Sequence, residues 1–226
     1  MTTYVLVHSA FGGGWQFRAL ASRLHAAGHE VHRPTLTGLG ERSHLLNPDI
    51  DLDTHIQDVC NVLIYEDLRD VILAGKSYGG MVVTGVAEQV PERLRHIVYL
   101  DAVVPQDGQS LVAALGPEAE TRMRQIAIEQ GNGWRLPASR EHNPRLTDHP
   151  FQTLIQPLAI RNPEAAALPH TFIRYQNDDQ SPHNAMTARV VQHTGELGWQ
   201  VHEIPGEPDL EQSDPDRLAD LLLKLR

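Results

Sequence analysis

Short apolar runs alternate along the chain with longer segments whose apolar residues recur at helical spacing. The short runs are rich in β-branched residues and are bounded by Gly, Pro, Asp or Asn, as strands usually are. They predict six strands, over Tyr4–Val7, Glu30–His32, Asp70–Ala74, His96–Leu100, Thr171–Tyr175 and Gln200–Ile204. The longer segments predict helices over Trp15–Ala27, Asp51–Ile64, Gly80–Val90, His183–Leu197 and Asp214–Leu225.

Strands that alternate with helices indicate parallel strands joined by crossover helices that cover both faces of a sheet. The predicted fold class is therefore α/β, with a doubly wound, mostly parallel sheet. Residues 106–168 break the alternation, since they show no strand pattern, are rich in Pro and Gly, and carry one helical pattern over Pro117–Gln130. This stretch is too long for a loop, so we expect an inserted helical lid over the carboxyl edge of the sheet, with residues 1–105 and 169–226 forming the core.

Composition disfavours several kinds of partner and site. The 226 residues carry a formal net charge of −10, which disfavours binding to the phosphates of nucleic acid. Cys60 is the single cysteine, and no histidine spacing is typical of a metal site, so we expect neither a disulfide nor a metal or other cofactor. The sequence shows neither a signal-peptide pattern nor an apolar stretch of about 18–20 residues. We expect a cytoplasmic protein that does not bind membranes. The sequence leaves open whether it forms a homodimer.

Residues 71–83 contain the sharpest chemical signal in the chain. An apolar strand runs into Gly-Lys-Ser-Tyr-Gly, residues 75–79, and continues directly into a helical pattern. In this context the serine of Gly-x-Ser-x-Gly lies on a strained turn, and its hydroxyl projects at the sheet edge near a helix N-terminus. Ser77 is the predicted nucleophile. The alternative is a tight turn with an incidental serine.

A glycine-rich loop follows the first predicted strand and precedes a helix, in residues 5–15. The backbone N–H groups of Ala10 and Tyr78 are the candidates for an oxyanion hole, because such sites combine the residue after the nucleophile with a loop from another strand end. A phosphate-binding loop is the competing interpretation. It is disfavoured because no Lys-Ser/Thr pair follows these glycines.

These motifs, together with Pro34–Arg42, Leu52–His55, Tyr99–Ala102 and Ile204–Gly206, resemble the α/β-hydrolases of the methylesterase and hydroxynitrile lyase group, including bacterial esterase-like members. The resemblance covers nearly the whole chain and implies a Ser-Asp-His order of catalytic residues. It assigns the nucleophile to Ser77 and the acid to Asp178, with Asp179 as the runner-up. Asp101, at the end of a strand, is by its position a candidate acid at the rim of the site, but the resemblance implies a structural role for it, which we adopt.

The resemblance breaks at the third catalytic residue. The family's histidine position, just after the last strand, holds Pro208 here, and an alignment gap would bring Glu207 there instead. Esterases of this group also carry Gly and His where this chain has Ser9 and Lys76. Three changes around one pocket suggest that it has been rebuilt, because serine needs a base within hydrogen-bonding reach to act as a nucleophile.

Several residues are candidates for a replacement base. His183 follows the predicted acid near the same sheet edge, His8 adjoins the oxyanion loop, and His142 and His149 lie on the predicted lid. A solvated or core histidine is the alternative for each of them. Lys76 is either a base whose pKa is lowered by burial or the cation of a buried ion pair with Glu207 or Asp209.

The aromatic residues Phe11, Trp15, Trp134 and Phe151 are candidates for lining the substrate pocket, with ordinary core packing as the alternative. The main functional hypothesis is an enzyme that acts on a small, largely apolar carbonyl or ester compound by a non-hydrolytic reaction, of the cyclase, isomerase or lyase type. Its catalytic residues would be Ser77, Asp178, Lys76 and Ser9. A serine carboxylesterase with a relocated histidine base and a non-catalytic ligand-binding protein are the alternatives.

Overall fold

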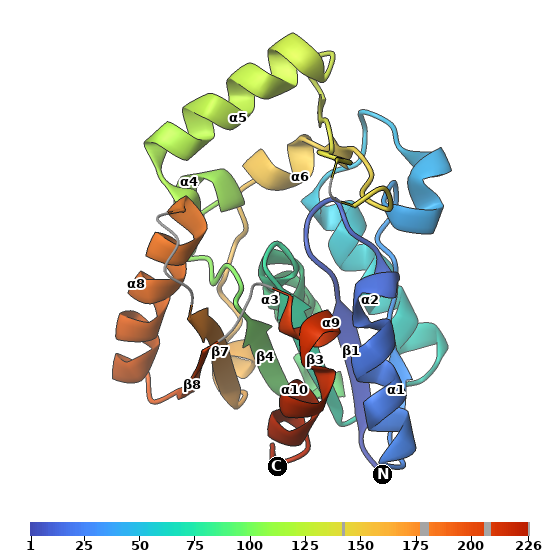
Figure 1. Ribbon diagram of the computed structural model, residues 1–226. Helices are drawn as coiled ribbons and strands as arrows, with labels where there is room; N and C mark the ends of the chain where they lie inside the picture. The colour runs from blue at the N-terminus through green and yellow to red at the C-terminus, as the bar shows by residue number, and fades with distance from the viewer. Residues whose placement is uncertain (142, 177–180, 206–208, 226) are drawn as a thin grey trace.

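The computed structural model describes residues 1–141, 143–176, 181–205 and 209–225. Its centre is a six-stranded sheet in the order β2-β1-β3-β4-β7-β8, in which all neighbouring strands are parallel (Figure 1). The strands are β1 (Thr3–Val7), β2 (Glu30–His32), β3 (Val71–Lys76), β4 (Leu94–Leu100), β7 (His170–Gln176) and β8 (Gln200–Pro205). Each lies where the sequence pattern predicts a strand, and the predicted α/β fold with a mostly parallel sheet is confirmed.

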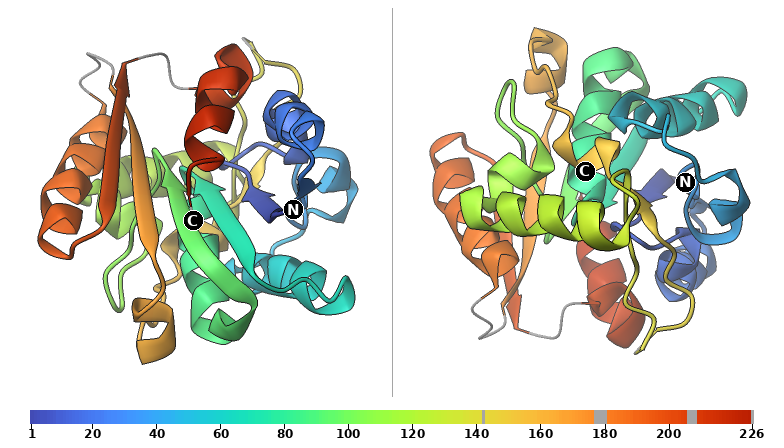
Figure 2. Two further views of the ribbon diagram at one scale, coloured as in Figure 1. Left: turned by 90° about the horizontal axis from the view of Figure 1, so that it is seen from below. Right: turned by 90° about the horizontal axis from the view of Figure 1, so that it is seen from above.

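Alternation along the strands sends side chains into two separate cores, one on each face of the sheet. In β1, Tyr4 and Leu6 belong to one core, and Val5 and Val7 belong to the other. The first core is covered by α1 (Arg18–Ala26) and α10 (Pro215–Leu222), and the second by α2 (Leu52–Tyr65), α3 (Gly79–Gln89) and α8 (Pro182–Glu196). Figure 2 shows these helices on both sides of the twisted sheet.

Local sequence signals fix where the helices begin. The Asp51 carboxylate accepts a hydrogen bond from the Thr54 N–H at 2.8 Å, and the Thr54 hydroxyl oxygen accepts from the Asp51 N–H, which together form a capping box at the start of α2. At α10, Asp214 caps the N–H of Arg217, and Pro215 occupies the first helical position, where no N–H is needed. These helices therefore begin within one residue of the predicted positions.

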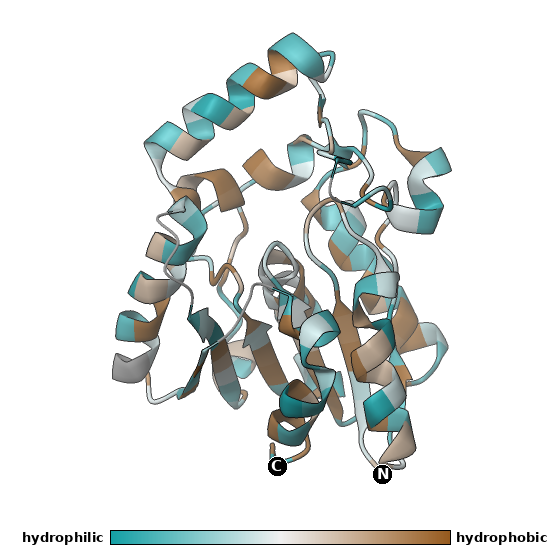
Figure 3. Cartoon of the chain, viewed as in Figure 1, coloured by the Kyte–Doolittle hydropathy of each residue, from teal (hydrophilic) through white to brown (hydrophobic). Residues whose placement is uncertain are grey.

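The stretch between β4 and β7 contains α4 (Leu111–Leu115), α5 (Pro117–Gln130), β5 (Arg135–Leu136), β6 (His149–Pro150), α6 (Gln152–Ile155) and α7 (Pro163–Ala166). Most of it, from α4 to α6, lies over the carboxyl edge of the sheet (Figure 1), whereas its last helix, α7, contacts residues 91–93 just before β4, at the opposite edge. We keep the name lid for residues 106–168. The expectation of no strand here is wrong in one detail, because β5 and β6 pair as a two-residue antiparallel ladder, too short for a periodic sequence signal. Figure 3 shows a largely hydrophilic α5 above apolar strands.

Three short 3₁₀ helices complete the description: η1 (Gly14–Phe17), η2 (Gly40–Leu45) and η3 (Pro91–Arg93). A short helix, α9 (Leu210–Ser213), follows β8 and leads into α10. No helix among the described residues has the length and apolarity needed to cross a bilayer. The single cysteine, Cys60, is buried on α2.

Candidate active site

A sharp turn joins β3 to α3 and carries Ser77 at its apex. Ser77 has φ = +50°, a left-handed conformation that costs a residue with a side chain roughly 1–2 kcal/mol. The glycines make the turn possible, since a Cβ on Gly75 would lie 2.5 Å from the carbonyl oxygen of Gly79, and one on Gly80 would lie 2.0 Å from that of Val103. The Ser77 carbonyl accepts the Val103 N–H at 3.0 Å. Strand, strained serine and helix are therefore in the arrangement of a nucleophile elbow.

Two backbone N–H groups beside this turn, those of Ala10 and Tyr78, have no hydrogen-bond partner among the residues that the structure describes. Ala10 lies in the loop after β1, and Tyr78 is the residue before the first turn of α3. Both line one cavity together with Ser77. Free N–H groups next to a nucleophile are suited to hold a developing oxyanion, and the N-terminus of α3 adds a favourable dipole.

The cavity above Ser77 has a volume of about 310 Å³ and a mostly apolar wall. Lid and loop side chains form this wall: Phe11, Val103, Leu111, Leu115, Met123 and Leu154. The polar side chains at its surface are Ser77, Arg122, Ser181 and His183. A small substrate with apolar groups on either side of a reacting carbonyl fits such a lining.

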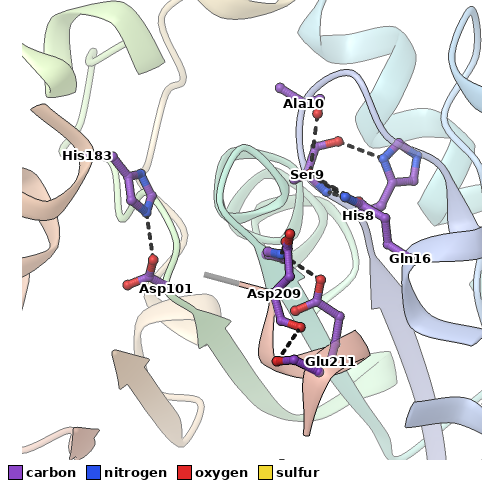
Figure 4. Close-up of polar contacts among 10 residues, drawn as sticks. His8, Ser9, Ala10, Gln16, Asp101, His183, Asp209 and Glu211 are labelled. Carbon is purple, nitrogen blue, oxygen red and sulfur yellow. Dashed lines mark hydrogen bonds and ion pairs between the residues drawn. The ribbon is translucent and has the colours of Figure 1, made fainter. Parts of the chain in front are cut away.

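His183, at the start of α8, is hydrogen-bonded to Asp101, which directly follows β4 (Figure 4). The imidazole Nε2 lies 2.8 Å from Asp101 Oδ2. Asp101 is buried, has φ = +45°, and its Oδ1 accepts the N–H of Tyr175 at 3.3 Å. The carboxylate is thus fixed by the sheet and orients an imidazole that reaches the same cavity as Ser77.

The Ser77 hydroxyl makes no hydrogen bond to His183 or to any other residue in the described part of the chain. Catalytic hydrogen bonds are often long in enzymes without substrate and shorten when substrate binds. His183 lines the cavity and remains a candidate base. The sequence analysis did not predict its pairing with Asp101, because the resemblance implied a structural role for Asp101. The available signal was an aspartate directly after a buried parallel strand.

Lys76 lies in a buried ion-pair cluster with α9. Its Nζ contacts the carboxylate of Asp209, one of the two partners expected from the sequence, and lies 2.5 Å from Glu211 Oε1. Burial alone would lower the pKa of Lys76, but Glu211 and Asp209 together raise it above its ordinary value. An ammonium group that is protonated and hydrogen-bonded to two carboxylates cannot accept a proton, so this geometry favours the ion pair over a catalytic base.

His8 and Ser9 are held by the scaffold of the oxyanion loop. His8 is fully buried, its Nδ1 lies 2.8 Å from the Ser9 carbonyl, and its Nε2 accepts the Leu36 N–H at 3.0 Å. Burial lowers the pKa of His8 to about 4, so it stays neutral with both nitrogens engaged. The N–H and hydroxyl of Ser9 both donate to Gln16 Oε1, at 3.1 and 3.0 Å (Figure 4). Neither side chain lines the cavity in the described structure.

The four candidate pocket aromatics separate in space. Phe11 lines the cavity, but the other three are not among its described lining residues. Trp15 faces the guanidinium of Arg145, 5.5 Å from its ring centre, and the side chain of Phe151 is buried in the core that contains α6. The backbone of Trp134 bonds that of Phe151, beside the β5–β6 ladder. Aromatic residue type alone did not distinguish a pocket wall from core packing.

Four residues named by the sequence analysis, Asp178, Asp179, Glu207 and Pro208, lie outside the described residues, as does His142. No group of three or more His, Cys, Asp or Glu side chains within the described ranges has the geometry to hold a metal ion.

A strained serine, two free N–H groups and a buried aspartate paired with a histidine at the wall of one apolar cavity, on a parallel sheet of this order, define an α/β-hydrolase. The sequence pattern of the Alpha/beta hydrolase family matches residues 4–221, and the chain belongs to that family. The resemblance to methylesterases, hydroxynitrile lyases and bacterial esterases is confirmed by the relatives found.

Among these relatives is the carbendazim hydrolyzing esterase of Nocardioides sp. (strain SG-4G), which is 37% identical over 244 aligned positions that cover all of both chains. The pyrethroid hydrolase of Sphingobium wenxiniae is 25% identical and is aligned over 98% of this chain and 86% of its own length. A solved extracellular alpha/beta-hydrolase from a Paenibacillus species superimposes with a TM-score of 0.85 at 22% identity, over 99% of this chain and 98% of its own. The first two of these relatives favour the esterase alternative over a lyase or cyclase, and the third supports the fold.

Proposed function

We propose that this protein is a serine hydrolase of small, largely apolar carboxylic esters, in which His183 serves as the relocated base. Ser77 is the nucleophile, Asp101 orients His183, and the N–H groups of Ala10 and Tyr78 hold the oxyanion. The observation that carries the proposal is the 2.8 Å contact between His183 and Asp101 at the wall of the cavity that also contains Ser77. The missing histidine at position 208 then has a functional replacement on α8.

The reaction divides into acylation and deacylation. The Ser77 Oγ attacks the ester carbonyl while His183 takes its proton, and the carbonyl oxygen becomes an oxyanion bound by the two N–H groups. The oxyanion then collapses, the bond to the alcohol breaks, and His183 gives its proton to the departing oxygen. A water that passes its proton to His183 attacks the acyl-serine, and the acid is released as the serine regains its hydrogen. The His183 side chain is 33% exposed, which leaves a path for this water.

The Asp101 carboxylate has the electrostatic role in this scheme. When His183 becomes an imidazolium, a buried carboxylate 2.8 Å away stabilises the new charge and holds the ring in one orientation. The Tyr175 N–H and the sheet keep that carboxylate in place. We therefore expect loss of Asp101 to lower the rate of the chemical step more than the affinity for substrate.

The test is hydrolysis of p-nitrophenyl acetate and butyrate, with carbendazim as a further substrate, by the wild type and by Ser77→Ala, His183→Ala and Asp101→Asn. We expect Ser77→Ala and His183→Ala to lower kcat/KM by at least about 10³-fold, and Asp101→Asn by about 10²–10⁴-fold. Ser213→Ala, a hydroxyl deletion outside the cavity, is the matched control and should keep wild-type rates.

Activity that needs Ser77 but survives His183→Ala would refute His183 as the base. Turnover of a carbonyl compound that survives Ser77→Ala would refute the serine mechanism and restore the non-hydrolytic interpretation. Labelling of the wild type, but not of Ser77→Ala, by a fluorophosphonate gives a second readout that does not depend on the choice of ester.

A further inference from the structure

The lid binds both backbone polar groups of Phe11, the residue that follows the oxyanion donor Ala10. The N–H of Phe11 donates to His149 Nδ1 at 3.2 Å, and its carbonyl accepts the Thr147 N–H at 3.0 Å. Phe11 has φ = +63°, a left-handed conformation that a phenylalanine adopts only when its surroundings hold it. The Thr147 hydroxyl also donates to the Phe11 carbonyl, at 3.4 Å, so three hydrogen bonds from the described lid residues restrain that conformation.

The neighbouring hydrogen bonds fix the protonation of His149. The Thr153 hydroxyl donates its one hydrogen to the Pro150 carbonyl at 2.8 Å, so at its 2.8 Å contact with His149 Nε2 it must accept. Nε2 therefore carries the hydrogen, which leaves Nδ1 as the acceptor that the Phe11 N–H requires. His149 and Thr153 are both fully buried, and burial holds the pKa of His149 well below its ordinary value.

The ring of His149 also contacts the other side of the oxyanion hole. Its centre lies 5.0 Å from the ring centre of Tyr78, edge to face, and 5.4 Å from that of Phe11. One buried imidazole on β6 thus contacts both sides of the proposed oxyanion hole. It contacts Phe11, the neighbour of Ala10, and Tyr78, which carries the second N–H. Ser9, on the far side of Ala10, is held by Gln16.

We propose that His149 is a positioning residue of the oxyanion hole: it fixes the backbone of Phe11 and thereby aims the N–H of Ala10. Lid and oxyanion loop form one structural unit through this contact. The inference rests on the proposed function for its kinetic consequence, whereas the restraint on Phe11 is a property of the fold that is measured without substrate.

The decisive pair of variants is His149→Leu and His149→Asn. Leucine fills a similar volume without an acceptor, whereas the amide oxygen of asparagine is placed close to where Nδ1 lies. His96→Leu is the matched control, because His96 is also buried, also bonds a threonine hydroxyl through Nε2 at 2.8 Å, and lies on β4 away from the cavity. It tests the cost of losing a buried imidazole as such.

Three measurements are made on all three variants and on the wild type. They are kcat and KM for p-nitrophenyl butyrate, the affinity for a trifluoromethyl ketone, and hydrogen exchange of the Phe11 amide. The ketone forms a tetrahedral adduct whose oxyanion needs the hole. We expect His149→Leu to lower kcat about 10- to 100-fold and the affinity for the ketone in parallel, with KM within threefold of the wild type. Removing one whole oxyanion donor lowers kcat by about 10²–10³-fold, and a misaligned donor should cost less. His149→Asn should recover most of both losses.

We also expect the Phe11 amide to exchange faster in His149→Leu than in the wild type or in His96→Leu. If His149→Leu and His96→Leu lose kcat equally, or if His149→Asn recovers nothing while it folds, the positioning role is refuted. If the Phe11 amide loses protection but no Ser77-dependent turnover exists in the wild type, the proposed function fails while the restraint on the loop stands. An unchanged amide with unchanged kinetics refutes the inference and leaves the proposed function intact.

Discussion

Replacing Lys76 by methionine is the perturbation for which the structure provides a magnitude. The Lys76 side chain is 8% exposed and the Glu211 side chain is fully buried, and Nζ and Oε1 are 2.5 Å apart. Methionine keeps most of the volume and removes the charge, so Glu211 is left as a buried carboxylate. Its second oxygen, Oε2, already lacks a hydrogen-bond partner in the described part of the chain.

Breaking a buried ion pair on one side typically costs about 3–5 kcal/mol, because the remaining charge keeps its desolvation penalty without compensation. Asp209 adds little to this cost, since its side chain is 60% exposed and its charge is screened by water. For a protein of this length, 1 kcal/mol corresponds to about 2–4 °C in Tm. Lys76→Met should therefore lower the free energy of unfolding by about 3–5 kcal/mol and Tm by about 6–20 °C.

The destabilisation should depend on pH. Burial raises the pKa of Glu211 above its ordinary value of 4.5, and Lys76 is the group that opposes this rise. In Lys76→Met the folded-state pKa rises further, so the carboxyl takes up a proton on folding. The contribution of Glu211 to the stability of the variant is then greatest below pH 4.5 and falls as pH rises through the higher folded-state pKa.

The assay is urea unfolding followed by tryptophan fluorescence, at pH 5 and pH 8, for Lys76→Met, Glu211→Gln and the double variant. Glutamine removes the buried negative charge, so the double variant should regain part of the stability that Lys76→Met loses, most of all at pH 8. A loss below about 1 kcal/mol in Lys76→Met, or a double variant no more stable than Lys76→Met, would show that the pair does not carry the stability assigned to it. At 15 °C the folded variant should keep kcat/KM within tenfold, whereas a catalytic base at this position would cost far more.

Two further predictions concern the elbow and the cavity. Gly80→Ala places a Cβ 2.0 Å from the Val103 carbonyl oxygen and should cost about 3 kcal/mol or more in urea unfolding. Gly108→Ala has open space around it and should cost only about 1 kcal/mol, because φ is +75° there, so equal losses would rule out the collision. Leu115→Ala enlarges the apolar wall and should raise kcat/KM for p-nitrophenyl hexanoate relative to acetate by up to about fourfold per added methylene accommodated, and an unchanged chain-length profile would exclude Leu115 from the acyl site.

Features encoded within a single stretch of residues could be predicted from the sequence. The strand–turn–helix at Ser77 is an example, since all its determinants, including the glycines that avoid collisions, lie within residues 71–83. The six strands are another, because each has its own apolar run with its own boundary residues.

Features that depend on distant contacts could not be predicted in this way. Asp101 and His183 are 82 positions apart, and only the paths of β4 and the start of α8 bring them together. The buried partners of Lys76 are 133 and 135 positions away, and the choice of Glu211 follows from how α9 folds back onto β3. The β5–β6 ladder has two residues a side, below the length at which alternation becomes visible.

The location of the Asp101–His183 pair has a consequence for how this fold tolerates change. In the proposed mechanism the acid directly follows a central strand of the sheet, β4, and the base lies on the helix that follows β7, so no reacting group comes from the chain beyond β8. In that mechanism the terminal stretch has a structural role alone: the carboxylates of Asp209 and Glu211 bind Lys76 and so attach this part of the chain to the end of β3. In this mechanism the residues that react and the carboxylates that hold the end of the chain are different groups. Substitutions at the carboxylates of Asp209 and Glu211 therefore leave every reacting group in place.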